Sequence, residues 1–155
     1  MSPRTLIAGF GNVLRGDDGF GVEVVRRLQL DERQLDGVET LEVGTGGIAL
    51  AQALMTPFAR LVIVDAMARG GAPGTVYVLR VESVEALRSV DMHMAVPSKA
   101  LGLAQAIGAL PPNIFMVGCE PSEVDQLEMA LSPPVHAAVD YAVREIWKLV
   151  AEDPG

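Results

Sequence analysis

The glycine-rich segment Gly9–Gly21 constrains the fold of this chain more than any other part of the sequence. An apolar run at residues 6–8 leads into it, and apolar residues recur at helical spacing through residues 18–30. The segment is therefore predicted to be a turn between a strand and the N-terminus of a helix. Turns of this kind commonly bring backbone N–H groups to a phosphate. Here Asp17 and Asp18 stand at that position, so the turn is expected to present carboxylates instead.

A dinucleotide-binding turn is the obvious alternative for such a segment. Gly9 and Gly11 match the first two glycines of that motif, but Leu14 occupies the position of the third. A partial glycine pattern is a weak signal, and acidic side chains at the helix start would repel a pyrophosphate. We therefore do not expect a dinucleotide site here.

Strand-like and helix-like segments alternate along the first part of the chain, which predicts a parallel sheet with right-handed crossovers. Strands are expected at residues 4–10, 38–43, 60–65, 75–81 and 114–117, and helices at 18–30, 48–55, 98–110 and 132–150. The link at residues 66–74 is too short for a parallel crossover. We therefore expect the strand at 75–81 to run antiparallel to its neighbours, at or near an edge. The result is one domain, residues 1–155, with a three-layer α/β/α architecture.

Two helix starts are predicted from capping residues. Asp17 or Asp18 is expected to cap the helix at 18–30, since a carboxylate is favourable at a helix N-terminus. Ser98 is expected to cap the helix at 98–110, directly after Pro97.

Composition restricts the partners. Twelve basic and twenty acidic residues give a net charge of −8, which argues against nucleic acid or an anionic membrane surface. No apolar run approaches the ~20 residues of a membrane span, and the N-terminus lacks the apolar region of a signal peptide. The single Cys119 cannot form an intramolecular disulfide and is expected to be a small buried apolar residue. We expect a cytoplasmic protein with no nucleic-acid or membrane partner.

Acidic residues follow two strands that are expected to be neighbours. Asp17 and Asp18 come after the first strand, and Asp65 closes the strand at 60–65. Ligands of open α/β sheets bind beyond the carboxyl ends of the strands, so these carboxylates should converge on one crevice. Two carboxylates brought together need a cation, a shared proton or separation by water. A site of carboxylate and imidazole ligands would suit Zn, Ni, Mn or Fe.

Each candidate also has a purely structural interpretation. One of the two adjacent aspartates can be an ordinary helix cap. His93 can be a loop histidine without a role, and His136, in the first turn of the last helix, is expected on the surface.

Several short motifs occur in order along nearly the whole chain. They are Gly9-x-Gly11-Asn12-x-Leu14-x-x-Asp17-Asp18-x-x-Gly21, Val64-Asp65-Ala66, Pro73-Gly74-Thr75, Leu101-Gly102-Leu103, Gly118-x-x-Pro121 and Leu131-Ser132-Pro133. In this order and spacing they resemble the hydrogenase maturation protease family. Its members are endopeptidases that remove the C-terminal extension of the nickel–iron hydrogenase large subunit. The resemblance implies a phosphorylase/hydrolase-like α/β fold with a mostly parallel five-stranded sheet and one antiparallel strand.

The resemblance also implies a nickel-binding site made of two acidic residues and a histidine. Carried over residue by residue, the acidic positions fall on Asp18 and Asp65, which are then the catalytic candidates. The family histidine precedes a helix, and Lys99 occupies that position here. Either His93, six residues earlier, supplies the ligand, or the alignment shifts locally, or the third ligand is absent. The nickel would arrive on the substrate, a large-subunit precursor, and would be held by Asp18, Asp65 and His93. Cleavage then requires a water activated by a carboxylate, as in an aspartic-type peptidase, or by a metal.

Two other functions stay open at this point. Lys99 has no lone pair for a metal when protonated and could pair with Asp18 or Asp65, which suggests a non-catalytic assembly factor with an altered metal site. A small-molecule-binding α/β domain that uses the glycine-rich turn Gly44–Gly47 is the remaining possibility.

Overall fold

The computed structural model describes residues 4–31, 36–86, 95–122 and 130–152. In chain order its elements are β1 (Thr5–Phe10), the 3₁₀ helix η1 (Gly16–Gly19), α1 (Phe20–Leu30), β2 (Val38–Gly44), α2 (Ile48–Ala53), β3 (Arg60–Ala66), β4 (Val76–Arg80), α4 (Ala95–Ala106), β5 (Asn113–Cys119) and α5 (Pro133–Ala151).

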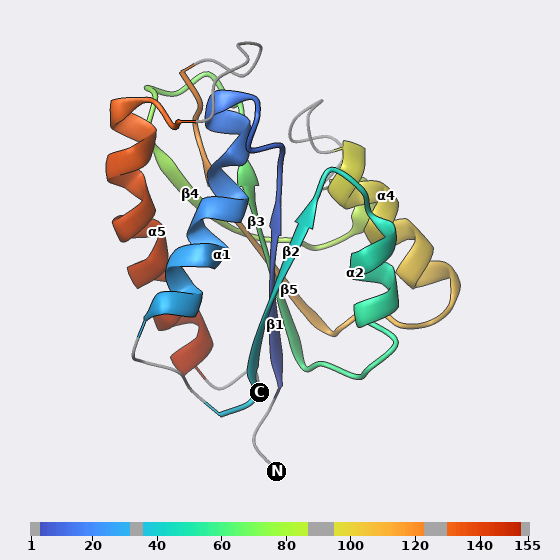
Figure 1. Cartoon of the computed structure of the whole chain (residues 1–155). Helices are drawn as coiled ribbons and strands as arrows, with labels where there is room; N and C mark the ends of the chain where they lie inside the picture. The colour runs from blue at the N-terminus through green and yellow to red at the C-terminus, as the bar shows by residue number, and fades with distance from the viewer. Residues whose placement is uncertain (1–3, 32–35, 87–94, 123–129, 153–155) are drawn as a thin grey trace.

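The strands form one sheet in the order β2-β1-β3-β5-β4. β1 pairs in parallel with β2 and β3, and β3 pairs in parallel with β5, whereas β4 runs antiparallel to β5 at one edge. Helices α1 and α5 cover one face and α2 and α4 cover the other (Figure 1). This is the predicted three-layer α/β/α fold, with a mostly parallel five-stranded sheet and one antiparallel strand.

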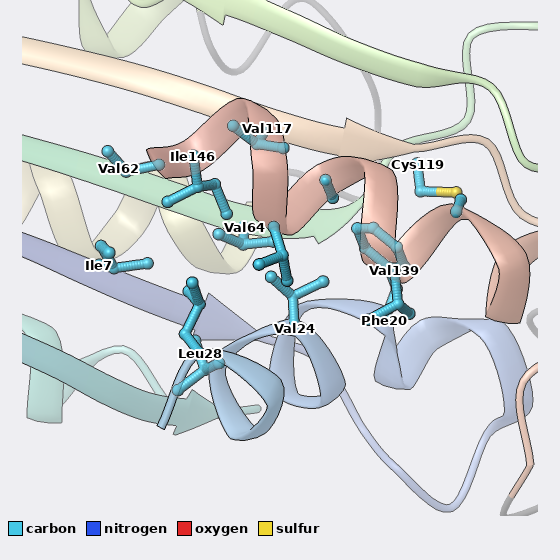
Figure 2. Packing of buried hydrophobic residues seen from close by; sticks show 14 of the residues in the cluster. Ile7, Phe20, Val24, Leu28, Val62, Val64, Val117, Cys119, Val139 and Ile146 are labelled. Atoms are coloured by element: carbon cyan, nitrogen blue, oxygen red, sulfur yellow. The ribbon is translucent and has the colours of Figure 1, made fainter. Parts of the chain in front are cut away.

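Side chains of the central strands alternate between two hydrophobic cores, as the pleat of a strand requires. Leu6 and Ala8 of β1 point into the core beneath α2 and α4, whereas Ile7 points into the core beneath α1 and α5. Figure 2 shows Ile7 in this second core with Phe20 of α1 and Ile146 of α5. All seven residues of β3 are buried, as expected for a strand covered on both faces.

Helix α1 packs unusually close to the sheet because glycines line the contact. A Cβ added at Gly9 would lie 2.4 Å from the carbonyl oxygen of Gly21, and one at Gly21 would lie 2.1 Å from that of Val64. Only hydrogen fits at these positions. The close approach fixes η1 and the start of α1 directly over the carboxyl ends of β1 and β3.

The predicted capping role of the two aspartates is wrong. Helix α1 begins at Phe20 with Gly19 as its N-cap, and no side chain caps it. Asp17 and Asp18 lie in the preceding 3₁₀ turn instead. Their side chains are therefore available for contacts outside the helix.

Ser98 is also not an N-cap. Helix α4 begins at Ala95, so Pro97 and Ser98 lie inside its first turns, where Ser98 is buried. Proline is tolerated there because the first N–H groups of a helix have no intrahelical partner. Pro97 therefore does not mark the boundary that we expected.

Across the described residues, no helix has the length and apolar character that crossing a membrane would require.

Candidate active site

The turn after β1 is built around Gly11. This residue has a φ of +127°, which side chains disfavour. Its N–H donates a 2.9 Å hydrogen bond to the carbonyl oxygen of Gly44, at the end of the adjacent β2. A Cβ at Gly11 would lie 1.8 Å from the carbonyl oxygen of Asp18. The backbone of η1 therefore passes directly against this glycine.

The Asp18 side chain folds back onto the same turn. Its Oδ2 accepts a 3.0 Å hydrogen bond from the N–H of Asn12, and the Asn12 side chain accepts one of 2.9 Å from the N–H of Leu14. Asp18 is half-buried. These bonds hold the carboxylate at the mouth of the turn, where it reaches solvent.

Asp65 approaches Gly11 from the neighbouring strand. It lies near the carboxyl end of β3, is 6 % exposed, and accepts a 2.8 Å hydrogen bond at Oδ1 from the N–H of Ala66. The same Oδ1 lies 3.5 Å from the point where a Cβ of Gly11 would sit. The structure thus brings Asp65 and the backbone of Asp18 to one glycine, at adjacent parallel strands. Asp65 therefore lies next to the turn that carries Asp18.

Asp17 has a role that the sequence did not reveal. It is 1 % exposed, and its Oδ1 accepts a 2.7 Å hydrogen bond from the N–H of Ser132. Its Oδ2 accepts bonds of 2.8 Å from the N–H of Ser122 and from the hydroxyl of Ser132. Asp17 therefore ties the turn that carries Asp18 to the chain beyond β5 and to the start of α5.

Glu120 is a second buried carboxylate that sequence reasoning missed. Its Oε1 accepts hydrogen bonds from the Tyr77 hydroxyl (2.7 Å) and from the N–H groups of Arg69 (2.8 Å) and Gly71 (2.9 Å). Burial raises the pKa of Glu120, but these hydrogen bonds outweigh it and hold the pKa below its usual value. The carboxylate fastens the loop that follows Asp65 to the end of β5.

Cys119 is fully buried, as predicted. Burial, followed by the nearby charges of Asp17 and Glu120, raises the pKa of its thiol to about 12. A thiol that stays protonated is not a nucleophile, so Cys119 serves as core.

Two residues, His93 and Lys99, were considered for the third position of the predicted site. His93 lies outside the described residues. Lys99 is exposed on α4, and its ion pair with Asp18 or Asp65 stays a prediction. His136 is exposed at the start of α5, as expected. Within residues 4–31, 36–86, 95–122 and 130–152, no three His, Cys, Asp or Glu side chains are grouped to hold a metal ion.

A hollow of about 330 Å³ adjoins the turn on its β2 side. The turn residues Gly11–Leu14 line one wall and Glu42–Thr45 line the other. Arg26 of α1 also lines the hollow and is paired with Glu42 at 3.1 Å. The hollow is thus bounded by the turn that leads to Asp18 and by the end of β2.

A family model described as hydrogenase maturation protease matches residues 22–149 of the chain. The hydrogenase expression/formation protein HoxM of Azotobacter vinelandii is 34 % identical over 154 residues, which cover 97 % of this chain and 74 % of that protein. The HupD protein of Rhodobacter capsulatus, described in the same words, is 32 % identical over 145 residues, 92 % of this chain and 69 % of its own length.

Solved structures agree with the sequence comparisons. The hydrogenase maturating endopeptidase HybD from E. coli superposes with a TM-score of 0.84 at 31 % identity, covering 95 % of this chain and 91 % of that one. The [NiFe] hydrogenase maturation protease HybD from Thermococcus kodakarensis superposes with a TM-score of 0.76, also at 31 % identity, covering 95 % and 99 %.

Proposed function

The chain belongs to the hydrogenase maturation protease family, and on that premise we propose that it is an endopeptidase that removes the C-terminal extension from the large-subunit precursor of a nickel–iron hydrogenase. The observation that carries this proposal is the meeting of Asp65 with the turn of Asp18 at Gly11. This arrangement supplies two carboxylates, the buried one of Asp65 and the half-buried one of Asp18.

We assign recognition of the loaded precursor to these carboxylates. The nickel belongs to the substrate, and Asp18 and Asp65 would bind it through their oxygens together with the imidazole of His93. A buried carboxylate such as Asp65 gains most from a cation, because a charge away from water is costly unless it is paired. In this way an unloaded precursor would bind more weakly than a loaded one.

Hydrolysis also needs an activated water. A carboxylate of the pair can accept its proton, and a metal ion can lower the pKa of a water bound to it. Both routes use Asp18 and Asp65. The peptidase is accordingly either aspartic-type or metal-dependent.

A second function is favoured by one observation, the exposed Lys99 at the position of the family histidine. A relative with an altered third position would bind the precursor and assist its assembly without cutting it. The two functions differ in one observable: only the peptidase releases the C-terminal extension of the precursor.

The test uses the full chain and a purified nickel-loaded precursor, with product mass measured by mass spectrometry. The wild type is expected to release the C-terminal extension. Asp18→Asn and Asp65→Asn should each lower the cleavage rate by about 10²-fold or more, the range for loss of a positioned acid–base group. Asp140→Asn is the matched control, because Asp140 is an exposed residue of α5. A wild type that binds the precursor and leaves its mass unchanged would replace the peptidase with the assembly factor.

A further inference from the structure

The two helical layers differ sharply in charge. On one face of the sheet, α1 and α5 carry several charged side chains, among them Glu23, Arg27, Asp140 and Lys148. On the other face, α2 and α4 lie side by side (Figure 1). Residues 43–59, which include α2, contain no charged residue, and neither do residues 100–119. Lys99 is the single charged residue of α4. Charge depletion of this kind is typical of the centre of a protein interface.

Large apolar side chains are exposed on the uncharged layer. They are Ile48 (66 %), Met55 (71 %), Leu103 (48 %) and Ile107 (55 %), and we call them the α2–α4 patch. A single exposed apolar residue needs no explanation, but a contiguous group marks an interaction site.

Ile48 and Leu103 lie on α2 and α4, two helices that touch, and Met55 and Ile107 lie in the turns that follow these helices. A Cβ at Gly47, just before α2, would lie 3.1 Å from the Cβ of Ala100 in α4. Leu103 is exposed on α4, and Ile107 is exposed in the turn directly after the last residue of that helix. Met55 and Ile107 line one hollow of about 550 Å³ between the ends of the two helices. The patch therefore extends from α2 and α4 to the turns that follow them, where it borders a hollow that can accept a side chain.

The other end of the patch reaches the candidate active site. Ile48 directly follows the Gly44–Gly47 turn, and the carbonyl of Gly44 holds Gly11 in place. Leu14, also exposed, stands in the turn that carries Asp18. A folded protein that lay on the patch would therefore place its nearest edge at the crevice.

We propose that the α2–α4 patch is the docking surface for the folded body of the large-subunit precursor, separate from the extension that is cut. The inference rests on the proposed function, which requires the enzyme to hold a protein-sized substrate. A second copy of this chain is the less suitable occupant. A copy that covered Ile48 and Leu14 would also stand over the turn of Asp18, where the substrate has to enter.

Single charges placed in the patch test the proposal. Leu103→Glu and Ile107→Glu should each raise the KM for the precursor about tenfold or more, with kcat nearly unchanged, because a buried carboxylate at an apolar interface is left unpaired. The affinity for the precursor, measured directly by surface plasmon resonance, should fall by the same factor. Leu30→Glu is the control, since Leu30 is exposed at the end of α1 and lies outside the patch. Thermal unfolding checks that the variants are folded, which their surface position favours.

The outcomes separate the inference from the proposed function. If the wild type cleaves and both variants keep its KM and affinity, the docking surface is refuted and the peptidase stands. If the wild type binds without cleaving and the variants lose binding, the docking surface holds and the peptidase fails. If the wild type sediments as a dimer, Leu103→Glu sediments as a monomer and KM is unchanged, the patch joins two copies and the proposal is overturned.

Discussion

The carboxylate of Asp17 accepts hydrogen bonds from both the backbone N–H and the hydroxyl of Ser132, which lies 115 residues further along the chain. These bonds, with a third from Ser122, join the turn of the candidate active site to the start of α5. Because Asp17 and Asp18 are adjacent, one turn contains both a buried structural carboxylate and a half-buried candidate for the chemistry.

Replacing Asp17 should therefore affect stability, and replacing Asp18 should affect cleavage. Asp17→Asn is expected to lower the free energy of unfolding by about 2–3 kcal/mol, because it weakens hydrogen bonds to a buried charged group. Asp18→Asn should cost less than about 1 kcal/mol, since it loses one partly exposed bond. Urea unfolding of both variants measures the difference. Equal losses would show that Asp17 does not hold the turn to α5.

Glu120→Gln should change how stability depends on pH. The native pKa of Glu120 is lowered, so its contribution to stability is present above the ordinary pKa and is lost as the pH falls through the native value. The variant should be less stable than the wild type at pH 7. The gap should narrow as the pH falls below the ordinary carboxyl pKa of 4.5 and then through the lower native pKa, because the wild-type carboxylate becomes protonated there. Denaturant unfolding across this range, with Glu152→Gln at the exposed end of α5 as control, checks the prediction. A gap that is constant with pH would contradict it.

The layered fold follows from local patterns that the sequence displays openly. Arg60–Ala66 is an unbroken buried run and had to be a central strand. The link before β4 lacks a helix, which left an antiparallel edge strand as the only short connection. The proximity of Asp65 to the turn that carries Asp18 follows from the same topology, because neighbouring parallel strands end at one edge.

The parts that were missed depend on contacts between distant residues. The partners of Asp17 lie 105 and 115 positions away, and no local pattern points to them. Glu120 is similar, since its partners lie in the loop after β3 and on β4. The start of α1 was misplaced because a 3₁₀ turn and an α-helical turn favour the same residues. Ser98 was misplaced because Pro97 is accepted inside a first turn as readily as before it.

The thiol of Cys119 should be unreactive in the native protein. Its pKa is raised to about 12 by burial and by the charges of Asp17 and Glu120, so almost no thiolate exists at pH 8. A thiol reagent such as DTNB should label it slowly in buffer and at once in denaturant. The raised pKa also makes the stability of the protein depend on pH. Its contribution to the free energy of unfolding is present below the ordinary thiol pKa of about 9 and is lost as the pH rises towards 12, because the thiol of the unfolded chain ionises first. Cys119→Ala should remove this alkaline part of the pH dependence, and rapid labelling of the native protein would show that the thiol is accessible.

The same substitution, glycine to alanine, should have opposite effects at Gly11 and Gly102. At Gly11 the backbone is left-handed, and the added Cβ would lie 1.8 Å from the carbonyl oxygen of Asp18. Gly11→Ala should therefore lower the free energy of unfolding by at least about 2 kcal/mol, from backbone strain and the clash together. It should also reduce cleavage, since relief of the clash moves Asp18 away from Asp65.

At Gly102, inside α4, a Cβ meets no atom within 4 Å. Gly102→Ala should raise stability by about 0.5–1 kcal/mol, because alanine favours the helix. Urea unfolding of both variants measures the change in the free energy of unfolding, and a precursor-cleavage assay measures the change in activity. A Gly11→Ala enzyme with wild-type cleavage would show that the turn does not set the position of Asp18.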